Sequence, residues 1–134
     1  MTLGYLTKDP VTRRYSLSVR LLDFAHHYLA SNELVQRAAP YLQQLSQETE
    51  EACNLSVLDG VETVFVLRFV SRHSHFPQMV GSRLPAYCTA SGLAILSTFS
   101  SEEVGKVLAA SRLIQHTPHT VVAPGKIKAR LQRA

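Results

Sequence analysis

The sequence predicts an α+β fold in which a basic hairpin and a connecting helix precede a small mixed domain. Three observations support this class. Two strand-like runs flank an Asp-Gly pair in mid-chain, apolar residues recur at helical spacing on both sides of them, and a charged, turn-rich stretch opens the sequence. The length of 134 residues and the hydrophobic share of 46% fit one ordinary domain with a small appendage.

The first predicted element is a β-hairpin over residues 4–17, GYLTKDPVTRRYSL. Its Asp-Pro pair marks a turn, because proline fixes its own φ and biases the preceding residue away from helix. Tyrosine and leucine residues on both sides of the turn favour strands. The hairpin carries Lys8, Arg13 and Arg14, so its tip is predicted to be exposed and basic.

Two helices are predicted to follow the hairpin. We expect Ser18 to cap the first, whose apolar residues cover more than one face and so predict two packing partners. Ser31-Asn32 ends this helix and is placed to cap the second, which has one apolar stripe. The stripe consists of Leu34, Ala38, Tyr41, Leu42 and Leu45. Pro40 predicts a kink or a short first segment.

The spacing of the apolar residues then changes from a helical period to an alternating pattern. Residues 52–58 and 62–70 read as an antiparallel pair of strands joined at Asp59-Gly60, which is a strong hairpin turn signal. Two strands alone seldom form a stable sheet. We therefore expect either further strands from elsewhere or an incomplete domain.

Loops and three helices complete the predicted order. Residues 71–80 read as a loop, Thr89 is predicted to cap a helix over 90–98, and Ser100 or Ser101 to cap another near 102–110. Prolines bracket a loop or short strand around 120–123, and a helix over 126–133 follows.

The charge distribution is more informative than the net charge of +4. The first twenty residues contain four basic residues and one acid, and the last nine contain four basic residues and no acid. Basic ends on a near-neutral body favour local contact with polyanions. Simple solvation of these charges is the alternative interpretation.

No arrangement of residues in the chain predicts catalysis. His73 and His75 form one pair and His116 and His119 another, but neither pair has a third metal ligand at suitable spacing. Cys88 has no paired general base, so a packed thiol or a pocket wall is the better interpretation than a nucleophile. We therefore expect no enzyme activity, no metal and no cofactor.

The stretch GSRLPAYCTASG places small residues where a helix begins. Free backbone N–H groups at such a start can receive the carboxylate of a small acid. A tight loop–helix junction without a ligand explains the same residues equally well.

Three segments together resemble one family, the isocitrate-lyase-regulator (IclR) type of bacterial transcription factor. GYLTKDPVTRRYSLSVRLLDFA is similar to its wing hairpin and linker helix, and LVQRAAPYLQQLSQETEEACNLSVLDGVETVFVLR to the start of its effector domain. GSRLPAYCTASGLAILS resembles its signature G-x-R-x-P-x-x-x-T-A-x-G-x-A. The matching positions are Gly81, Arg83, Pro85, Thr89, Ala90, Gly92 and Ala94.

The resemblance implies a winged helix-turn-helix joined by a helix to a GAF-like effector-binding domain. It also implies a cytoplasmic, dimeric or tetrameric regulator that binds DNA and responds to a small organic acid. The variant GSRLPAYCT resembles members that govern aromatic-acid breakdown through the β-ketoadipate route. The implied ligand-binding residues are Phe76, Ala90 and Ser91, while Arg83 is as compatible with a structural role. Leu93 and Tyr87 replace a basic residue and a histidine that are common in the family.

The resemblance further implies a domain order. Residues 1–18 correspond to the remnant of the winged helix, 19–32 to the linker helix and 33–134 to part of the effector-binding domain. The recognition helix and later strands have no counterpart, so we expect a truncated regulator with Lys8, Arg13 and Arg14 as contacts to the DNA backbone. The alternative is a stand-alone dimerisation or interaction module that acts on an intact regulator.

Overall fold

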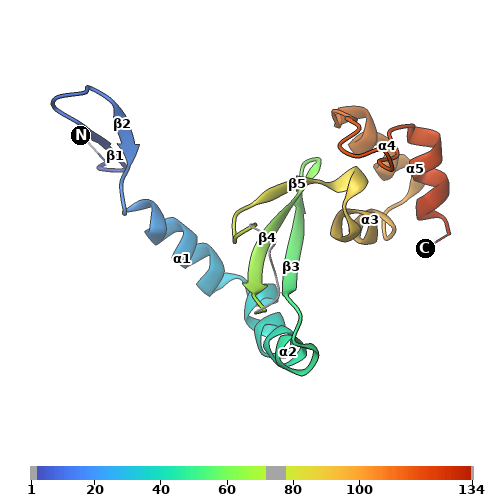
Figure 1. Ribbon diagram of the computed structural model, residues 1–134, viewed down its shortest axis with the longest axis horizontal. Coiled ribbons are helices and arrows are strands. Elements are labelled where there is room, and N and C mark those ends of the chain that lie inside the picture. The colour runs from blue at the N-terminus through green and yellow to red at the C-terminus, as the bar shows by residue number, and fades with distance from the viewer. Residues whose placement is uncertain (1–2, 72–77, 134) are drawn as a thin grey trace. The chain divides into compact units, whose positions relative to one another are not determined.

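A computed structural model describes residues 3–71 and 78–133 of the chain. The chain divides into two compact units, Met1–Tyr41 and Leu42–Ala134. Figure 1 shows the order of the elements in each unit, and each unit is described by itself below. Within the described residues, no helix is long and apolar enough to cross a membrane.

The first unit opens with the predicted hairpin. Strands β1 (Leu6–Lys8) and β2 (Tyr15–Leu17) pair antiparallel, and all six residues are exposed. The carboxylate of Asp9 accepts hydrogen bonds from the backbone N–H groups of Thr12 at 2.7 Å and Val11 at 2.8 Å. These two bonds favour the ionised carboxylate, so they lower the pKa of Asp9 and hold the turn.

Helix α1 (Leu21–Ser31) follows the hairpin but begins later than predicted. The expected cap at Ser18 is wrong, because its backbone N–H donates to the carbonyl of Tyr5 and ties the residue to the hairpin. The Ser18 hydroxyl accepts from the N–H of Arg20, within the turn that precedes the helix. Tyr5 and Phe24 lie with ring centroids 5.0 Å apart, so aromatic packing also links hairpin and helix.

Helix α2 (Glu33–Thr49) begins as the sequence predicts, since the Asn32 side chain accepts a hydrogen bond from the N–H of Val35. The helix runs without interruption through Pro40, so the expected separate first segment is wrong. Proline removes one backbone donor there, and the bonds of the neighbouring turns maintain the helix. The predicted apolar stripe stays largely outside the core, with Leu34 52% and Tyr41 75% exposed.

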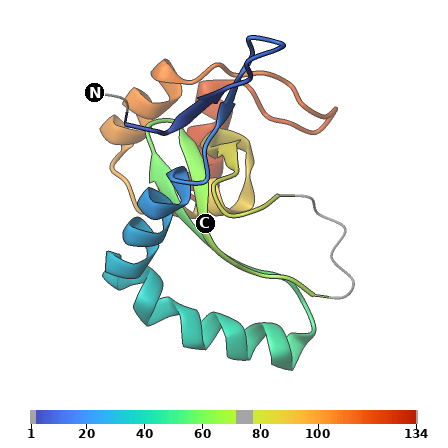
Figure 2. The same cartoon turned by 90° about the vertical axis from the view of Figure 1, so that its left-hand side faces the viewer.

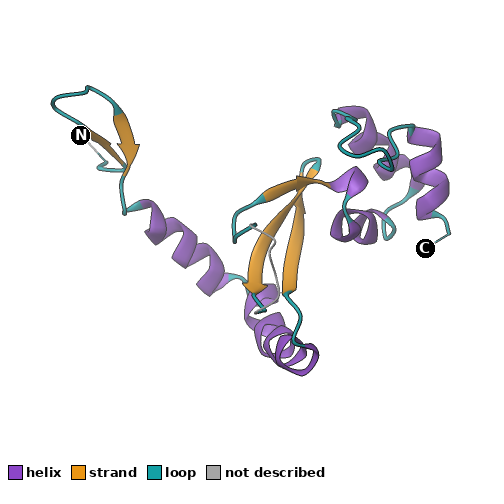
Figure 3. Ribbon diagram, in the orientation of Figure 1, coloured by secondary structure: helices purple, strands orange, loops and turns teal. Residues whose placement is uncertain are grey.

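The second unit is built on a three-stranded antiparallel sheet in the order β3-β4-β5 (Figure 3). Strands β3 (Cys53–Asp59) and β4 (Glu62–Phe69) form the predicted hairpin, in which Gly60 supplies the positive φ of +63° that the turn requires. Strand β5 (Arg83–Pro85), which was not predicted, pairs with the start of β4.

Four helical segments follow the sheet: η1 (Ala86–Cys88), α3 (Ala90–Leu96), α4 (Ser101–Ala110) and α5 (Pro124–Leu131). Figures 1 and 2 show α3, α4 and α5 gathered beside the turn end of the β3–β4 hairpin. The predicted caps are confirmed, because the Thr89 hydroxyl accepts from the N–H of Gly92 and Ser100 forms a capping box with Glu103. The segment before α5 is a loop rather than a strand.

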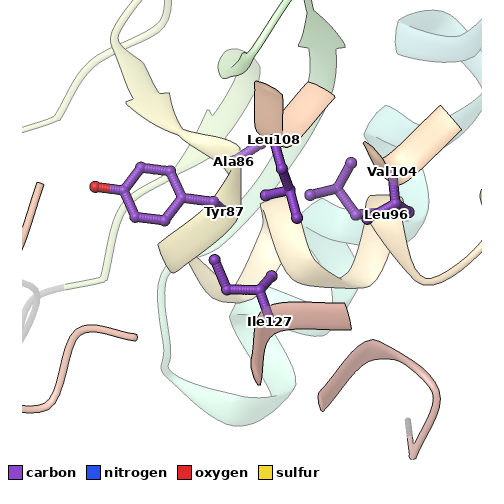
Figure 4. Packing of buried hydrophobic residues seen from close by; sticks show 6 residues of the cluster. All are labelled: Ala86, Tyr87, Leu96, Val104, Leu108 and Ile127. Atoms are coloured by element: carbon purple, nitrogen blue, oxygen red, sulfur yellow. The ribbon is translucent and has the colours of Figure 1, made fainter. Parts of the chain in front are cut away.

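The core of this unit lies between the helices (Figure 4). Its buried members are Ala86, Tyr87, Leu96, Val104, Leu108 and Ile127. Gly92 allows α3 to approach η1 closely: a Cβ at this position would lie 2.6 Å from the carbonyl carbon of Ala86 and closer still to its Cα and oxygen. The loop–helix junction is therefore tightly packed, as one of the two sequence interpretations expects.

Candidate functional site

A cavity of about 610 Å³ lies within the second unit, a size typical of small-molecule sites. Its walls come from β5, η1, the start of α3, the loop that precedes α5, and α5 itself. The apolar part of the lining consists of Leu84, Pro85, Tyr87, Leu93, Val121 and Ile127. The polar part consists of Gln78, Cys88, Thr89, His116, Thr117, His119, Thr120 and Arg130.

The three threonines of the lining are committed to the protein itself. The Thr89 hydroxyl donates to the carbonyl of Pro85 at 3.0 Å while it caps α3. The hydroxyls of Thr117 and Thr120 lie 3.1 Å apart, and each also accepts a backbone N–H of the same loop. These groups shape the wall, and their hydrogen-bonding capacity is largely used.

Tyr87 anchors one wall of the cavity to another. Its hydroxyl donates to the carbonyl of Ile114 at 2.6 Å and accepts from the N–H of Ile114 at 2.8 Å. Burial raises the pKa of Tyr87, so the phenol remains neutral and can make both bonds. The His116 ring stacks on the Tyr87 ring with centroids 6.4 Å apart.

Cys88 lies in the cavity wall, which is one of the two placements that the sequence predicts. Burial raises the pKa of its thiol, which keeps the sulfur protonated and weakly nucleophilic. The thiol is 3.9 Å from the carbonyl oxygen of Pro85, to which it makes a weak hydrogen bond. This environment is that of a packed thiol.

Among the polar side chains of the lining, Arg130 and Gln78 have unused capacity toward the described residues. Arg130, an exposed residue of α5, forms no ion pair with any described residue. The side-chain oxygen of Gln78 is buried and has no hydrogen-bond partner. Within the described residues, the cavity therefore combines an apolar surface with a cation that lacks an acidic partner and an acceptor that lacks a donor.

The structure places Ala90 and Ser91, two of the three predicted ligand-binding residues, beside the cavity rather than in its lining. Ala90 is exposed and Ser91 half-buried at the start of α3, between the lining residues Thr89 and Leu93. Phe76 lies outside the described residues, as do His73 and His75. Roles of Ala90, Ser91 and Phe76 in ligand binding stay predictions.

Arg83 has the structural role that the sequence left open. Its guanidinium contacts the carboxylates of Asp59 at 2.6 Å and Glu62 at 2.8 Å, on either side of the β3–β4 turn. The hydrogen bonds that Arg83 donates to Glu62 and, to a smaller extent, to Asp59 raise the pKa of Arg83. This side chain fastens β5 to the hairpin.

The second histidine pair, His116 and His119, does line the cavity. Among the residues that the structure describes, no group of three or more His, Cys, Asp or Glu side chains is placed to hold a metal ion.

Neither Gln78 nor Arg130 was predicted to belong to this site. Arg130 follows the buried Ile127 by three positions, so the helical period places the two residues on the same face of a short helix. That spacing is a weak sequence signal for the position of Arg130. Gln78 carries no local signal, since the burial of a single oxygen is a tertiary property.

The predicted DNA-contacting residues lie in the hairpin of the first unit. Lys8 ends β1 with its ammonium 5.1 Å from the centroid of the Tyr15 ring. Arg13 and Arg14 are exposed at the tip, where Arg13 has a positive φ of 59°. None of the three basic side chains pairs with an acid among the described residues.

Comparison with known proteins establishes the family. The family described as "Bacterial transcriptional regulator IclR C-terminal" matches residues 26–134. The chain belongs to this family. It is 35% identical to the Pca regulon regulatory protein of Pseudomonas putida over 133 residues, which cover 98% of this chain and 45% of that protein. The relatives are transcription regulators and not enzymes, which confirms the absence of enzyme activity expected from the sequence.

Solved structures of IclR regulators share the fold. The crystal structure of a putative transcriptional regulator from Rhodococcus sp. RHA1 matches 98% of this chain and 51% of its own, with a TM-score of 0.81 and 32% identity. An IclR homologue from Microbacterium hydrocarbonoxydans, crystallised with 4-hydroxybenzoate, matches 96% of this chain and 53% of its own with a TM-score of 0.75 and 27% identity. The chain spans about half the length of the curated relatives it matches.

Proposed function

We propose that this chain is the effector-sensing part of an IclR-type transcription regulator and that its cavity binds a small organic acid. The observation that carries the proposal is Arg130, a cation in the wall of a largely apolar cavity that has no acidic partner among the residues 3–71 and 78–133. A carboxylate ligand supplies the missing counter-charge, while its carbon skeleton contacts the apolar walls.

An aromatic acid fits this cavity well. The exposed ring of His116 offers a flat surface on which a benzene ring can stack. Two relatives agree with this class, since one is the Pca regulon regulatory protein and another was crystallised with 4-hydroxybenzoate. We therefore infer an aromatic acid as the effector, with short keto acids as the comparison class.

Calorimetric titration tests the ligand. We expect 4-hydroxybenzoate or protocatechuate to bind more tightly than pyruvate. Arg130→Gln should weaken the aromatic acid about three- to tenfold, a modest effect because the residue is exposed. Arg133→Gln, which removes the same charge just beyond α5 and outside the cavity lining, is the matched control. Equal losses in the two variants would contradict the role of Arg130.

We further propose that the basic hairpin contacts DNA phosphates. Residues 1–18 then act as the remnant of a winged helix and 19–32 as its linker, ahead of the effector domain at 33–134. Lys8, Arg13 and Arg14 position a protein on DNA without reading its sequence.

Fluorescence anisotropy with a random-sequence duplex tests this contact. We expect weak, salt-dependent binding whose slope against log salt falls by about one for each of the three residues changed to alanine. A tight, sequence-selective complex formed by these 134 residues would contradict the assignment.

Self-association through α1 completes the proposal. Leu22 is 64% exposed and Phe24 58% exposed, an unusual apolar surface for a short helix. We expect sedimentation to detect a homodimer that Leu22→Lys weakens, while Val11→Lys at the hairpin tip leaves it intact. The alternative of a stand-alone interaction module predicts instead a preference for an intact regulator over a second copy of this chain.

We place the regulator in the cytoplasm, where its operators lie.

A further inference from the structure

The side-chain amide of Gln78 is an unusual feature of the cavity. Its oxygen is buried and accepts no hydrogen bond, although Gln78 itself lines the cavity. An unsatisfied buried acceptor destabilises the free protein, and native structures retain few of them. Such an oxygen in a cavity wall is a candidate for a hydrogen bond to a ligand.

Several hydroxyl groups of the cavity wall are engaged in bonds to other groups of the protein. The hydroxyls of Thr117 and Thr120 pair with each other, and that of Tyr87 donates to the carbonyl of Ile114. The Tyr87 proton is therefore committed, and neither threonine donates to the Gln78 oxygen. The terminal torsion of a glutamine rotates easily, so a donor that enters the cavity can draw the oxygen out of its buried position.

We propose that Gln78 makes the cavity selective for acids that also carry a hydroxyl group. This inference rests on the proposed function, in which Arg130 receives the carboxylate. A ligand hydroxyl donates to the Gln78 oxygen and removes the cost of the unsatisfied acceptor. An acid without a donor leaves that cost in place, because a site with an unpaired polar group discriminates against an analogue that cannot pair with it.

Calorimetric titration of the 134-residue chain with matched acids tests this selectivity. The pairs are 4-hydroxybenzoate with 4-methylbenzoate, and 3-hydroxybutyrate with butyrate. In at least one pair we expect the hydroxyl-bearing acid to bind about tenfold more tightly. Gln78→Met, which keeps the volume and removes the acceptor, should abolish the preference. Gln47→Met, an exposed glutamine of α2 outside the cavity lining, is the control and should retain it.

Thermal unfolding without ligand gives a second measurement. We expect Gln78→Met to melt at a higher temperature than the wild type, because it removes a buried acceptor that has no partner, whereas Gln47→Met should melt with the wild type. A lower melting temperature of Gln78→Met would show that the oxygen is satisfied in the free protein and would overturn the inference.

The outcomes separate the two proposals. Acids that bind in an Arg130-dependent manner without any hydroxyl preference overturn the role of Gln78 and leave the proposed function intact. A hydroxyl preference that survives in Gln78→Met has the same consequence. If no acid of the panel binds, or if Arg130→Gln has no effect, the proposed function fails and the selectivity fails with it.

Discussion

Replacement of Gly92 by alanine should severely destabilise the second unit. The added Cβ would lie 2.6 Å from the carbonyl carbon of Ala86, whereas ordinary contacts of such an atom begin at 3.4 Å. The obstacle is the backbone of a fully buried residue, which cannot rotate away as a long side chain would. Overpacking of a core typically costs about 1–3 kcal/mol, and we expect about 3 kcal/mol here because η1 and α3 must separate.

Gly105→Ala is the matched control for this substitution. Gly105 lies in the middle of α4, and a Cβ there would meet only the Nζ of Lys128 at 3.0 Å, the end of a flexible side chain. Alanine is the better helix former by about 0.5–1 kcal/mol, so this variant should be slightly more stable than the wild type. The same chemical change is therefore expected to have opposite signs at the two glycines.

Urea unfolding followed by circular dichroism measures both effects. With an m-value of about 1–3 kcal/mol per molar urea, a loss of 3 kcal/mol lowers the midpoint by about 1–3 M. In thermal unfolding, the same loss lowers the Tm by about 10–20 °C for a domain of this size. A Gly92→Ala midpoint equal to that of Gly105→Ala would refute the close approach of η1 to α3.

Three further substitutions follow from the described contacts. Tyr87→Phe should lower the free energy of unfolding by about 1–3 kcal/mol in urea titration, because both backbone groups of Ile114 lose their partner. Ser100 lowers the pKa of Glu103, so the stability from this pair is complete above the pKa of the unfolded glutamate and disappears as the pH falls through the lower, folded value. Glu103→Gln should therefore be less stable than the wild type at pH 7 and equal to it in acid, as seen in thermal unfolding across pH. Arg83→Gln should lower the urea midpoint at low salt and much less in 1 M salt, since the ion pairs across the β3–β4 turn are exposed and screened.

Opposite results would point to specific errors. An unchanged midpoint for Tyr87→Phe would mean that the phenol does not hold the loop. A difference for Glu103→Gln that persists in acid would exclude the capping carboxylate as its source. A salt-independent loss for Arg83→Gln would indicate packing rather than charge.

Local signals in the sequence were sufficient for the elements that depend on a few adjacent residues. The Asp59-Gly60 pair forms the turn expected of it, and Thr89 and Ser100 both cap helices. Strand β5 was missed because it has three residues and pairs with β4 some twenty positions earlier, so its conformation is decided by a distant partner. The expected cap at Ser18 failed for a similar reason, since a hydrogen bond to the hairpin determines its place.

The candidate site was less accessible to prediction than the fold. Its lining extends from Gln78 to Arg130, with five residues from the loop before α5 and one or two from each of several other elements. A pocket wall was one of the two positions predicted for Cys88, and the structure places the residue there. His116 and His119 were noted as a pair, but their place in a cavity wall was not predicted. An unpaired cation and an unsatisfied oxygen are defined by what surrounds them, so composition and spacing cannot identify them.

The double hydrogen bond between Tyr87 and Ile114 has a consequence for measurement. It joins positions 27 residues apart, and the N–H of Ile114 lies in a loop where most amide protons should exchange rapidly with deuterium. Exchange at Ile114 is slow only while the phenol stays in place against the wall of the cavity. That single proton is therefore a built-in reporter, readable by NMR without a label on the ligand, of whether the wall and the loop are still joined.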